Sequence, residues 1–341
     1  FSNSTVSAFL VNKEAVFNDT EKQYSVGLDH FNRVAGSEFN YRSTNGKFTT
    51  AAFYHRSFTE IDTLDKEFAA GLTMGYLTRK FSVISLFREV GNDYSAEVGF
   101  VPRLDFKRSF TQVKRNFYPR NNSISSHGIG AEYEQIWNNQ RSRTDQMAAL
   151  GYEVNFKNLA TVRLKATIDY TYLLDDFDPS RKDSIFLAAG TDYTYKRITW
   201  EHGSNTRKSI FYRFNGSVGE FFNGNIFNLN GNINYRIRPI FNFSVDYTYN
   251  RIRLPEPYED ADLFLIGPRF EFTFTRNLFF TSLIQYNNQL ENINLNARFQ
   301  WRYKPVSDFF LVYTDNYFTS PIFLGARNRA IVFKLTYWLN M

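Results

Sequence analysis

Cysteine is absent from this chain of 341 residues, which excludes disulfides, thiolate nucleophiles and cysteine-ligated metals. Long apolar runs are also absent: no stretch approaches the roughly 18 residues of a transmembrane helix. The charge is not strongly of one sign, since 40 Lys and Arg stand against 34 Asp and Glu, a net charge of +6. This modest excess is spread along the chain, so we predict no nucleic-acid partner.

Aromatic residues, by contrast, are abundant. The chain has 37 Phe and 22 Tyr, yet its mean hydropathy is −0.42, because the rings alternate with polar residues. In 160–172, every second residue from Ala160 to Tyr172 is apolar, and Thr, Arg, Lys and Asp lie between. This period of two indicates a β-strand rather than a helix. The same alternation recurs in 226–236, 241–250, 292–303 and 331–341.

The connections between these runs alternate in length. Short joints occur at Asn45-Gly46, Arg79-Lys80, Lys157-Asn158, Arg238-Pro239, Arg276-Asn277 and Lys304-Pro305. Longer polar connections lie between them, at 13–31, 59–66, 91–105, 173–190, 254–261 and 318–328. Short turns at one rim and longer loops at the other are typical of outer-membrane barrels. We therefore predict an all-β fold: a closed, antiparallel, up-and-down transmembrane barrel of about 18 strands (range 16–20), with 1–341 as one domain.

A soluble β-sandwich would show a similar alternation, with one face in a core and the other in water. Many long strands joined by tight turns favour the membrane, where the apolar face contacts lipid and no strand edge stays unpaired. We expect an integral protein of the bacterial outer membrane, with both termini periplasmic and with lipid, including lipopolysaccharide, as a partner. Aromatics near strand ends, such as Tyr170 and Tyr172, are expected at the membrane interfaces.

Three segments carry a resemblance to a known family: "RVAGSEFNYRSTNGKF" (33–48), "SAEVGFVPRLDF" (95–106) and "FQWRYKPVSDFFLVYTDNY" (299–317). Together they resemble a Bacteroidota outer-membrane β-barrel domain family of unknown function. In that family the barrel usually follows a module like a family-nine carbohydrate-binding module. The resemblance implies the barrel fold, a module upstream of Phe1 and a glycan as a candidate ligand, but it implies no activity.

If the apolar faces meet lipid, a charged set must point into the lumen. Its members are Arg163, Lys165, Asp169, Arg213, Arg236, Asp246, Arg269, Glu271, Arg298, Arg302 and Lys334. Two interpretations stay open: a lining that selects solutes, or acids and bases that pair across neighbouring strands because unpaired buried charge is costly. The asparagine rows in 226–236 and 292–296 are interpreted likewise, as hydrogen-bonded lining or as contacts for sugar hydroxyls.

The motif "GFVPR" is expected in a loop between strands. Gly99 and Pro102 would shape a turn, Phe100 would anchor it through apolar contacts, and Arg103 would reach a carboxylate or a backbone carbonyl. Two tripeptides, Asp62-Thr63-Leu64 and Asp183-Ser184-Ile185, match the O-glycosylation pattern of Bacteroidota, with Thr63 and Ser184 as acceptors.

Catalytic signals are weak. The histidines, His30, His55, His127 and His202, have no metal-ligand spacing, and HExxH, GxSxG and Walker-type motifs are absent. We predict no catalytic residue, no metal and no cofactor. The leading functional hypothesis is a structural or docking component of an envelope complex, or an anchor for a glycan-related module. The alternative is a porin-like channel for small hydrophilic solutes, and a hydrolase at the barrel rim is ranked last.

Overall fold

The computed structural model describes residues 3–14, 31–60, 65–120, 123–141, 143–182, 185–320 and 325–339. These ranges form 18 strands: β1 (Ser4–Glu14), β2 (Phe31–Arg42), β3 (Phe48–Phe58), β4 (Phe68–Leu77), β5 (Phe81–Val90), β6 (Phe106–Phe117), β7 (Ile124–Trp137), β8 (Asp145–Phe156), β9 (Thr161–Tyr172), β10 (Asp192–Gly203), β11 (Ile210–Phe221), β12 (Gly224–Ile237), β13 (Phe241–Arg253), β14 (Ala261–Thr275), β15 (Leu278–Asn287), β16 (Asn292–Lys304), β17 (Ser307–Phe318) and β18 (Gly325–Leu335). Within the described ranges, no helix has the length and apolar character to cross a membrane. The predicted all-β, 18-stranded fold is confirmed.

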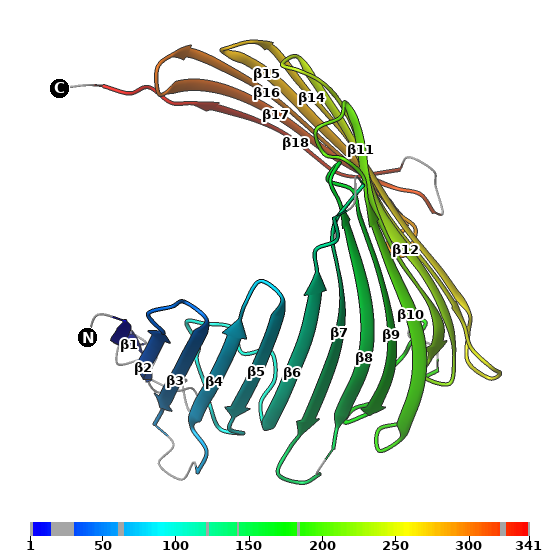
Figure 1. Cartoon of the computed structure of the whole chain (residues 1–341). Helices are drawn as coiled ribbons and strands as arrows, with labels where there is room; N and C mark the ends of the chain where they lie inside the picture. The colour runs from blue at the N-terminus through cyan, green and yellow to red at the C-terminus, as the bar shows by residue number, and fades with distance from the viewer. Residues whose placement is uncertain are drawn as a thin grey trace, which may run out of the picture.

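Each strand pairs antiparallel with the next one along the chain, from β1–β2 to β17–β18. The result is a single up-and-down sheet that curls around a wide hollow (Figure 1). Strands β1 and β18 form its two edges and face each other across an opening (Figure 1). Among the residues described, no ladder joins these two edges, so the expected closure of the barrel is not seen in this structure.

The two rims of the sheet differ in their connections. One rim, which we call the short-turn rim, holds 43–47, 78–80, 118–123, 157–160, 204–209, 238–240, 276–277 and 305–306. At the opposite rim, which we call the long-loop rim, lie the strand ends that flank 15–30, 59–67, 91–105, 138–144, 173–191, 222–223, 254–260, 288–291 and 319–324. All six short joints identified in the sequence lie at the short-turn rim, and the strand ends that flank all six longer connections lie at the long-loop rim.

Both described ends of the chain lie at the short-turn rim. The backbone oxygen of Asn3 accepts a hydrogen bond from the Arg42 amide, beside the first short turn. At the other end, the Trp338 amide donates to the Ser307 hydroxyl, beside the last short turn. The two ends of the described chain therefore share one rim, as an even number of strands requires.

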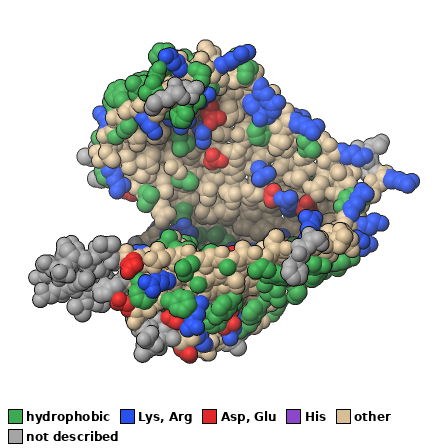
Figure 2. All heavy atoms as spheres, turned by 90° about the vertical axis from the view of Figure 1, so that its left-hand side faces the viewer, with side chains coloured by type: hydrophobic (Ala, Val, Ile, Leu, Met, Phe, Trp, Pro, Cys, Tyr) green, Lys and Arg blue, Asp and Glu red, His purple; other side chains and the backbone are tan. Residues whose placement is uncertain are grey.

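The two faces of the sheet have opposite chemistry. The convex face exposes large apolar side chains at mid-strand, such as Leu150 (57% exposed), Leu164 (52%) and Ile198 (54%). Acidic and basic side chains line the hollow, while hydrophobic side chains cover the outside of the strands seen in Figure 2. A conventional core is small, because the main buried apolar cluster holds only Val34, Ala69, Val90 and Tyr94. The apolar face of the sheet thus points outward, as in a barrel whose outer surface contacts lipid.

Two connections fold inward over the concave face at the long-loop rim. In 91–105, Tyr94 packs against Val34 and Val90, and the Asn32 amide donates to the Ser95 carbonyl. In 173–191, Leu187 is fully buried, and the Phe177 ring lies 4.9 Å from that of Phe222. Side chains of both loops thus pack against the sheet at this rim.

Candidate solute site on the inner wall

The strand register places the whole predicted charged set on one face. Arg163 lies opposite Glu201 in the β9–β10 ladder, whereas its neighbour Leu164 lies opposite Trp200 on the convex face. The same alternation, carried through the ladders, puts the following residues on the concave face: Arg163, Lys165, Asp169, Arg213, Arg236, Asp246, Arg269, Glu271, Arg298, Arg302 and Lys334. Glu201 and His202 accordingly point to opposite faces, as adjacent strand residues must.

A recess of about 450 Å³ lies in the wall formed by β6–β12. Gly130 and Gly151, which are partners in the β7–β8 ladder, form part of its floor. A Cβ atom would lie 3.4 Å from the nearest atom at Gly130 and 3.5 Å at Gly151, so the backbone could accept side chains there. The recess exists because both side chains are missing. Its polar lining is Gln112, Lys114, Glu132, Glu153, Arg163, Lys165, Thr199, Glu201, Asn215, Ser217, Asn228 and Asn230.

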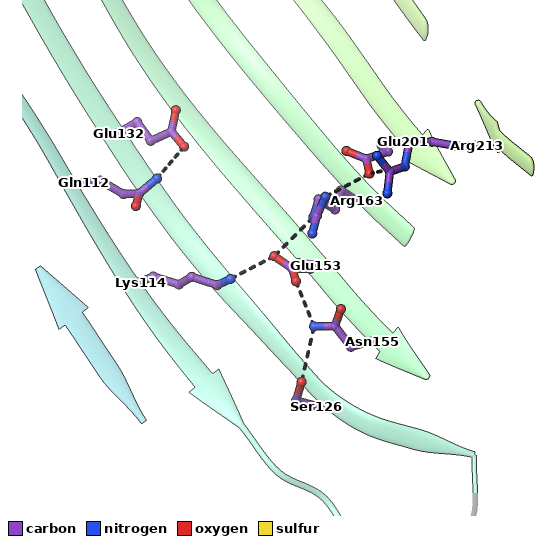
Figure 3. A network of polar contacts seen from close by, with 9 residues as sticks. All are labelled: Gln112, Lys114, Ser126, Glu132, Glu153, Asn155, Arg163, Glu201 and Arg213. Carbon is purple, nitrogen blue, oxygen red and sulfur yellow. Dashed lines mark hydrogen bonds and ion pairs between the residues drawn. The ribbon is translucent and has the colours of Figure 1, made fainter. Parts of the chain in front are cut away.

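Ion pairs link the charged groups around the recess (Figure 3). Glu153 lies 2.8 Å from the Lys114 ammonium and 3.4 Å from Arg163 Nε. Arg163 continues to Glu201 at 2.9 Å, and Lys165 lies 3.1 Å from Glu132. Three acids thus balance three bases in the lining, so the recess carries little net charge while it offers many donors and acceptors.

The asparagine row of β12 enters the recess lining with Asn228 and Asn230 and continues the polar surface beyond it. The Asn215 amide donates to Asn230 at 3.1 Å, Asn230 donates to Asn228 at 2.9 Å, and Asn228 donates to Asn250 at 2.6 Å. Asn232 donates to Asp246 at 2.6 Å. Much of this row is therefore engaged within the wall, and its orientation is fixed before any solute arrives.

The remaining charged residues of the predicted set are dispersed along the wall. Ion pairs join Asp169 to Arg197 (3.2 Å), Arg269 to Glu271 (2.6 Å) and Arg302 to Asp308 (3.3 Å). Arg236 donates to the Thr206 carbonyl. Arg298 and Lys334 form no ion pair within the described ranges. Pairing across or along strands thus accounts for most of the set.

Sequence reasoning missed four of the six charged residues of the recess, since Glu201 on β10 was not among the predicted lumen residues. Nor were Lys114, Glu132 and Glu153. They lie on β6, β7 and β8, where glycines such as Gly128 and Gly130 interrupt the alternation. The detectable signal was the Gly-x-Gly-x-Glu series from Gly128 to Glu132, in which every second position faces the lumen.

In the loop motif "GFVPR", Arg103 and not Phe100 attaches the loop to the barrel wall. Arg103 contacts the Asp145 carboxylate at 2.9 Å and the Thr144 hydroxyl at 3.1 Å, both at the start of β8. The expected apolar anchor is wrong, since Phe100 is 88% exposed. Tyr94, in the preceding part of the loop, packs in the cluster instead. Gly99 donates to the Ala96 carbonyl, which places a turn just before Pro102.

The three histidines that the structure describes lie apart from the recess, and His30 lies outside the described residues. His55 faces the hollow between Phe9 and Phe53. His127 stacks on the ring of Phe117, and the His202 ring lies 5.5 Å from that of Tyr212 at an angle of 45°. In the part of the chain that is described, no three His, Asp or Glu side chains are close enough to hold a metal ion. The predicted glycosylation acceptors Thr63 and Ser184 lie outside the described residues.

No protein-family model and no curated protein matches this sequence. Similar solved structures include the siderophore receptor PirA from Pseudomonas aeruginosa, at 10% identity and a TM-score of 0.41, covering 89% of this chain and 68% of that chain. A mutant of the ferric enterobactin receptor PfeA from Pseudomonas aeruginosa matches at 7% identity and a TM-score of 0.38, covering 92% and 68%. These similarities are too remote to transfer a ligand or an activity to this chain.

Proposed function

We propose that this chain is an integral outer-membrane barrel that acts as a porin-like channel for small, near-neutral, hydroxyl-rich solutes. The observation that supports this proposal most strongly is the charge-balanced recess on β6–β12. It is lined by three acids, three bases and several amides and hydroxyls. Balanced charge disfavours strong retention of an ion of either sign, while many hydrogen-bonding groups replace the water shell of a polyol. Weak contacts of this kind assist passage without trapping the solute.

The apolar convex face supports the location in a membrane. Exposed side chains such as Leu150, Leu164 and Ile198 would form a contiguous apolar surface far larger than a soluble protein tolerates. In a membrane this face carries no free-energy cost of exposure to water, because lipid hydrocarbon surrounds it.

The channel is tested by single-channel conductance in planar bilayers and by the swelling rate of liposomes in neutral sugars. The purified wild type should conduct, and an absence of conductance above background would remove the proposal. Gly151→Phe fills the recess and should slow sugar uptake. The matched control is Gly267→Phe on β14. This position also faces the lumen, and a Cβ atom added there would lie at least 3.9 Å from any neighbouring atom. Equal sugar uptake by the two variants would show that the recess plays no part in transport.

A docking role is the second candidate, favoured by apolar side chains exposed at the long-loop rim. Val98 and Phe100 are 63% and 88% exposed in loop 91–105, which Arg103 and Tyr94 hold in place. A fixed, exposed apolar pair suits a protein partner of the envelope. Extraction in mild detergent should co-purify a stoichiometric partner, and Phe100→Ser should release it. A wild type that always purifies alone would count against this role.

A further inference from the structure

Two arginines of the connection between β7 and β8 lie over the rings of tyrosines of β9. The Arg141 guanidinium carbon is 3.6 Å from the centre of the Tyr172 ring, and that of Arg143 is 3.7 Å from the centre of Tyr170. Tyr170 and Tyr172 alternate with the lumen-facing Asp169 and therefore share the convex face with Ile168. The stacks thus stand on the outside of the barrel, at its long-loop rim.

Hydrogen bonds extend these stacks into a band across β7–β9. Arg141 donates to the Tyr170 hydroxyl at 3.3 Å, and Arg143 donates to Gln146 at 3.1 Å. Gln146 in turn donates to the Tyr133 hydroxyl at 2.7 Å. Neutral amide and hydroxyl groups hold the two cations in position, and neither of these contacts is an ion pair.

The balance of charge in this band differs from that of the inner wall. Neither Arg141 nor Arg143 forms an ion pair with any described residue; Arg141 interacts only at longer range with the carboxylate of Asp192, which lies opposite Tyr172 in the β9–β10 ladder. Both arginine side chains are exposed. Their remaining N–H donors are free to bind an oxyanion, and a guanidinium stacked on a ring is well suited to phosphate.

We infer that the Arg141–Arg143 band binds the phosphate group of a phosphorylated glycolipid in the outer leaflet. This inference rests on the proposed function, because the long-loop rim meets the outer leaflet only if the chain is an outer-membrane barrel with short periplasmic turns. Tyrosines on the lipid-facing side mark the headgroup level. A lipid whose headgroup carries phosphate on a sugar would place its oxyanion beside both guanidinium groups and its acyl chains along Ile168 and Leu164.

The test titrates the purified, folded protein with lipid A and with dephosphorylated lipid A. Wild type should prefer the phosphorylated lipid, and the double variant Arg141→Gln/Arg143→Gln should lose about thirtyfold in affinity, since each basic side chain at an anionic surface contributes about 1 kcal/mol. The matched control is Arg79→Gln/Arg115→Gln. It removes two arginines that lie over Tyr118 and Phe117 at the short-turn rim, and its affinity should change by less than about twofold.

Equal affinity of the wild type and the double variant would overturn the headgroup site. Displacement of the lipid by inorganic phosphate at matched phosphate concentration would also overturn it, in favour of a free-anion site. Conductance and heat-modifiable migration of the double variant should match those of the wild type, which shows that it folds. A wild type that does not insert into bilayers refutes the proposed function itself, whereas one that conducts without preferring the phosphorylated lipid refutes only this inference.

Discussion

Glu153 illustrates how single residues set the character of the inner wall. Its carboxylate contacts Lys114 and Arg163, and it accepts a further bond from Asn155 at 2.8 Å. The two basic side chains are about one third to one half exposed, so each pair adds little to stability. The effect that matters is on the field inside the lumen, where the Glu153 carboxylate offsets one of the three positive charges around the recess.

Replacing this carboxylate should change ion selectivity more than stability. Glu153→Gln keeps the shape of the side chain but leaves the recess with one excess positive charge. Under a salt gradient, the reversal potential should shift toward anion preference. Glu259→Gln, in a rim loop where the carboxylate pairs with Lys182 at 3.2 Å, is the control and should shift it less. An unchanged potential for Glu153→Gln would show that ions do not pass the recess.

The two faces should also tolerate a new charge very differently. Ile198 lies at the middle of β10 on the convex face, and an arginine there should cost about 2–4 kcal/mol of folding free energy near the membrane midplane. Thr248 lies on the concave face beside a second recess of about 280 Å³ that also borders Asp246. Thr248→Arg should therefore cost far less. Heat-modifiable migration measures the folded fraction, and normal folding of Ile198→Arg with failure of Thr248→Arg would reverse the faces.

At the scale of elements, strands and short turns could be predicted from sequence because their signals are local. Alternation over a dozen residues gives the face of each strand, and residues such as Asn45-Gly46 give the turn, with Gly46 at a φ of 67° that favours glycine. The inward loops depend on distant contacts instead. Arg103 forms hydrogen bonds with Asp145 and Thr144, which are about 40 positions away in the sequence. A local sequence pattern cannot predict such a contact.

The two rims should differ in their exposure on intact cells. Pro257 lies in connection 254–260 at the long-loop rim, and Asn45 lies in the first short turn; both are exposed. Because the chain has no native cysteine, Pro257→Cys should react with a membrane-impermeant maleimide and Asn45→Cys should not. Breaking the outer membrane should make both react. The opposite order on intact cells would invert the orientation.

At the scale of the whole molecule, the number and direction of the strands followed from the sequence, but the recess and the open edges did not. A recess on β6–β12 arises from the sum of glycines and charges contributed by seven strands, so no single strand reveals it. The edge strands carry matching apolar positions on the convex face, including Val6 and Leu10 on β1 and Ile331 and Phe333 on β18. Unpaired edges are not stable in hydrocarbon, so we expect β1 and β18 to pair in the membrane.

Cross-linking tests this closure. A cysteine at Ala8 on β1 is combined in turn with one at Arg329, Ile331 or Phe333 on β18, and each pair is oxidised in membranes. One register position should form a disulfide, because cross-strand neighbours lie close enough to bond. The same Ala8 cysteine combined with one at Ala166 on β9 is the control and should form none. A failure of all three β18 positions would leave the sheet open.

The central claim is that one face of each strand meets lipid and the other meets water. A nitroxide scan of β9 in vesicles measures this directly, with a spin label placed at each position from 162 to 169 in turn. Collision with oxygen, which concentrates in lipid, should peak at Leu164, Ala166 and Ile168, whereas collision with a water-soluble nickel chelate should peak at the positions between them. Equal access of the chelate to both sets of positions would show a strand in water on both faces and would contradict the membrane barrel.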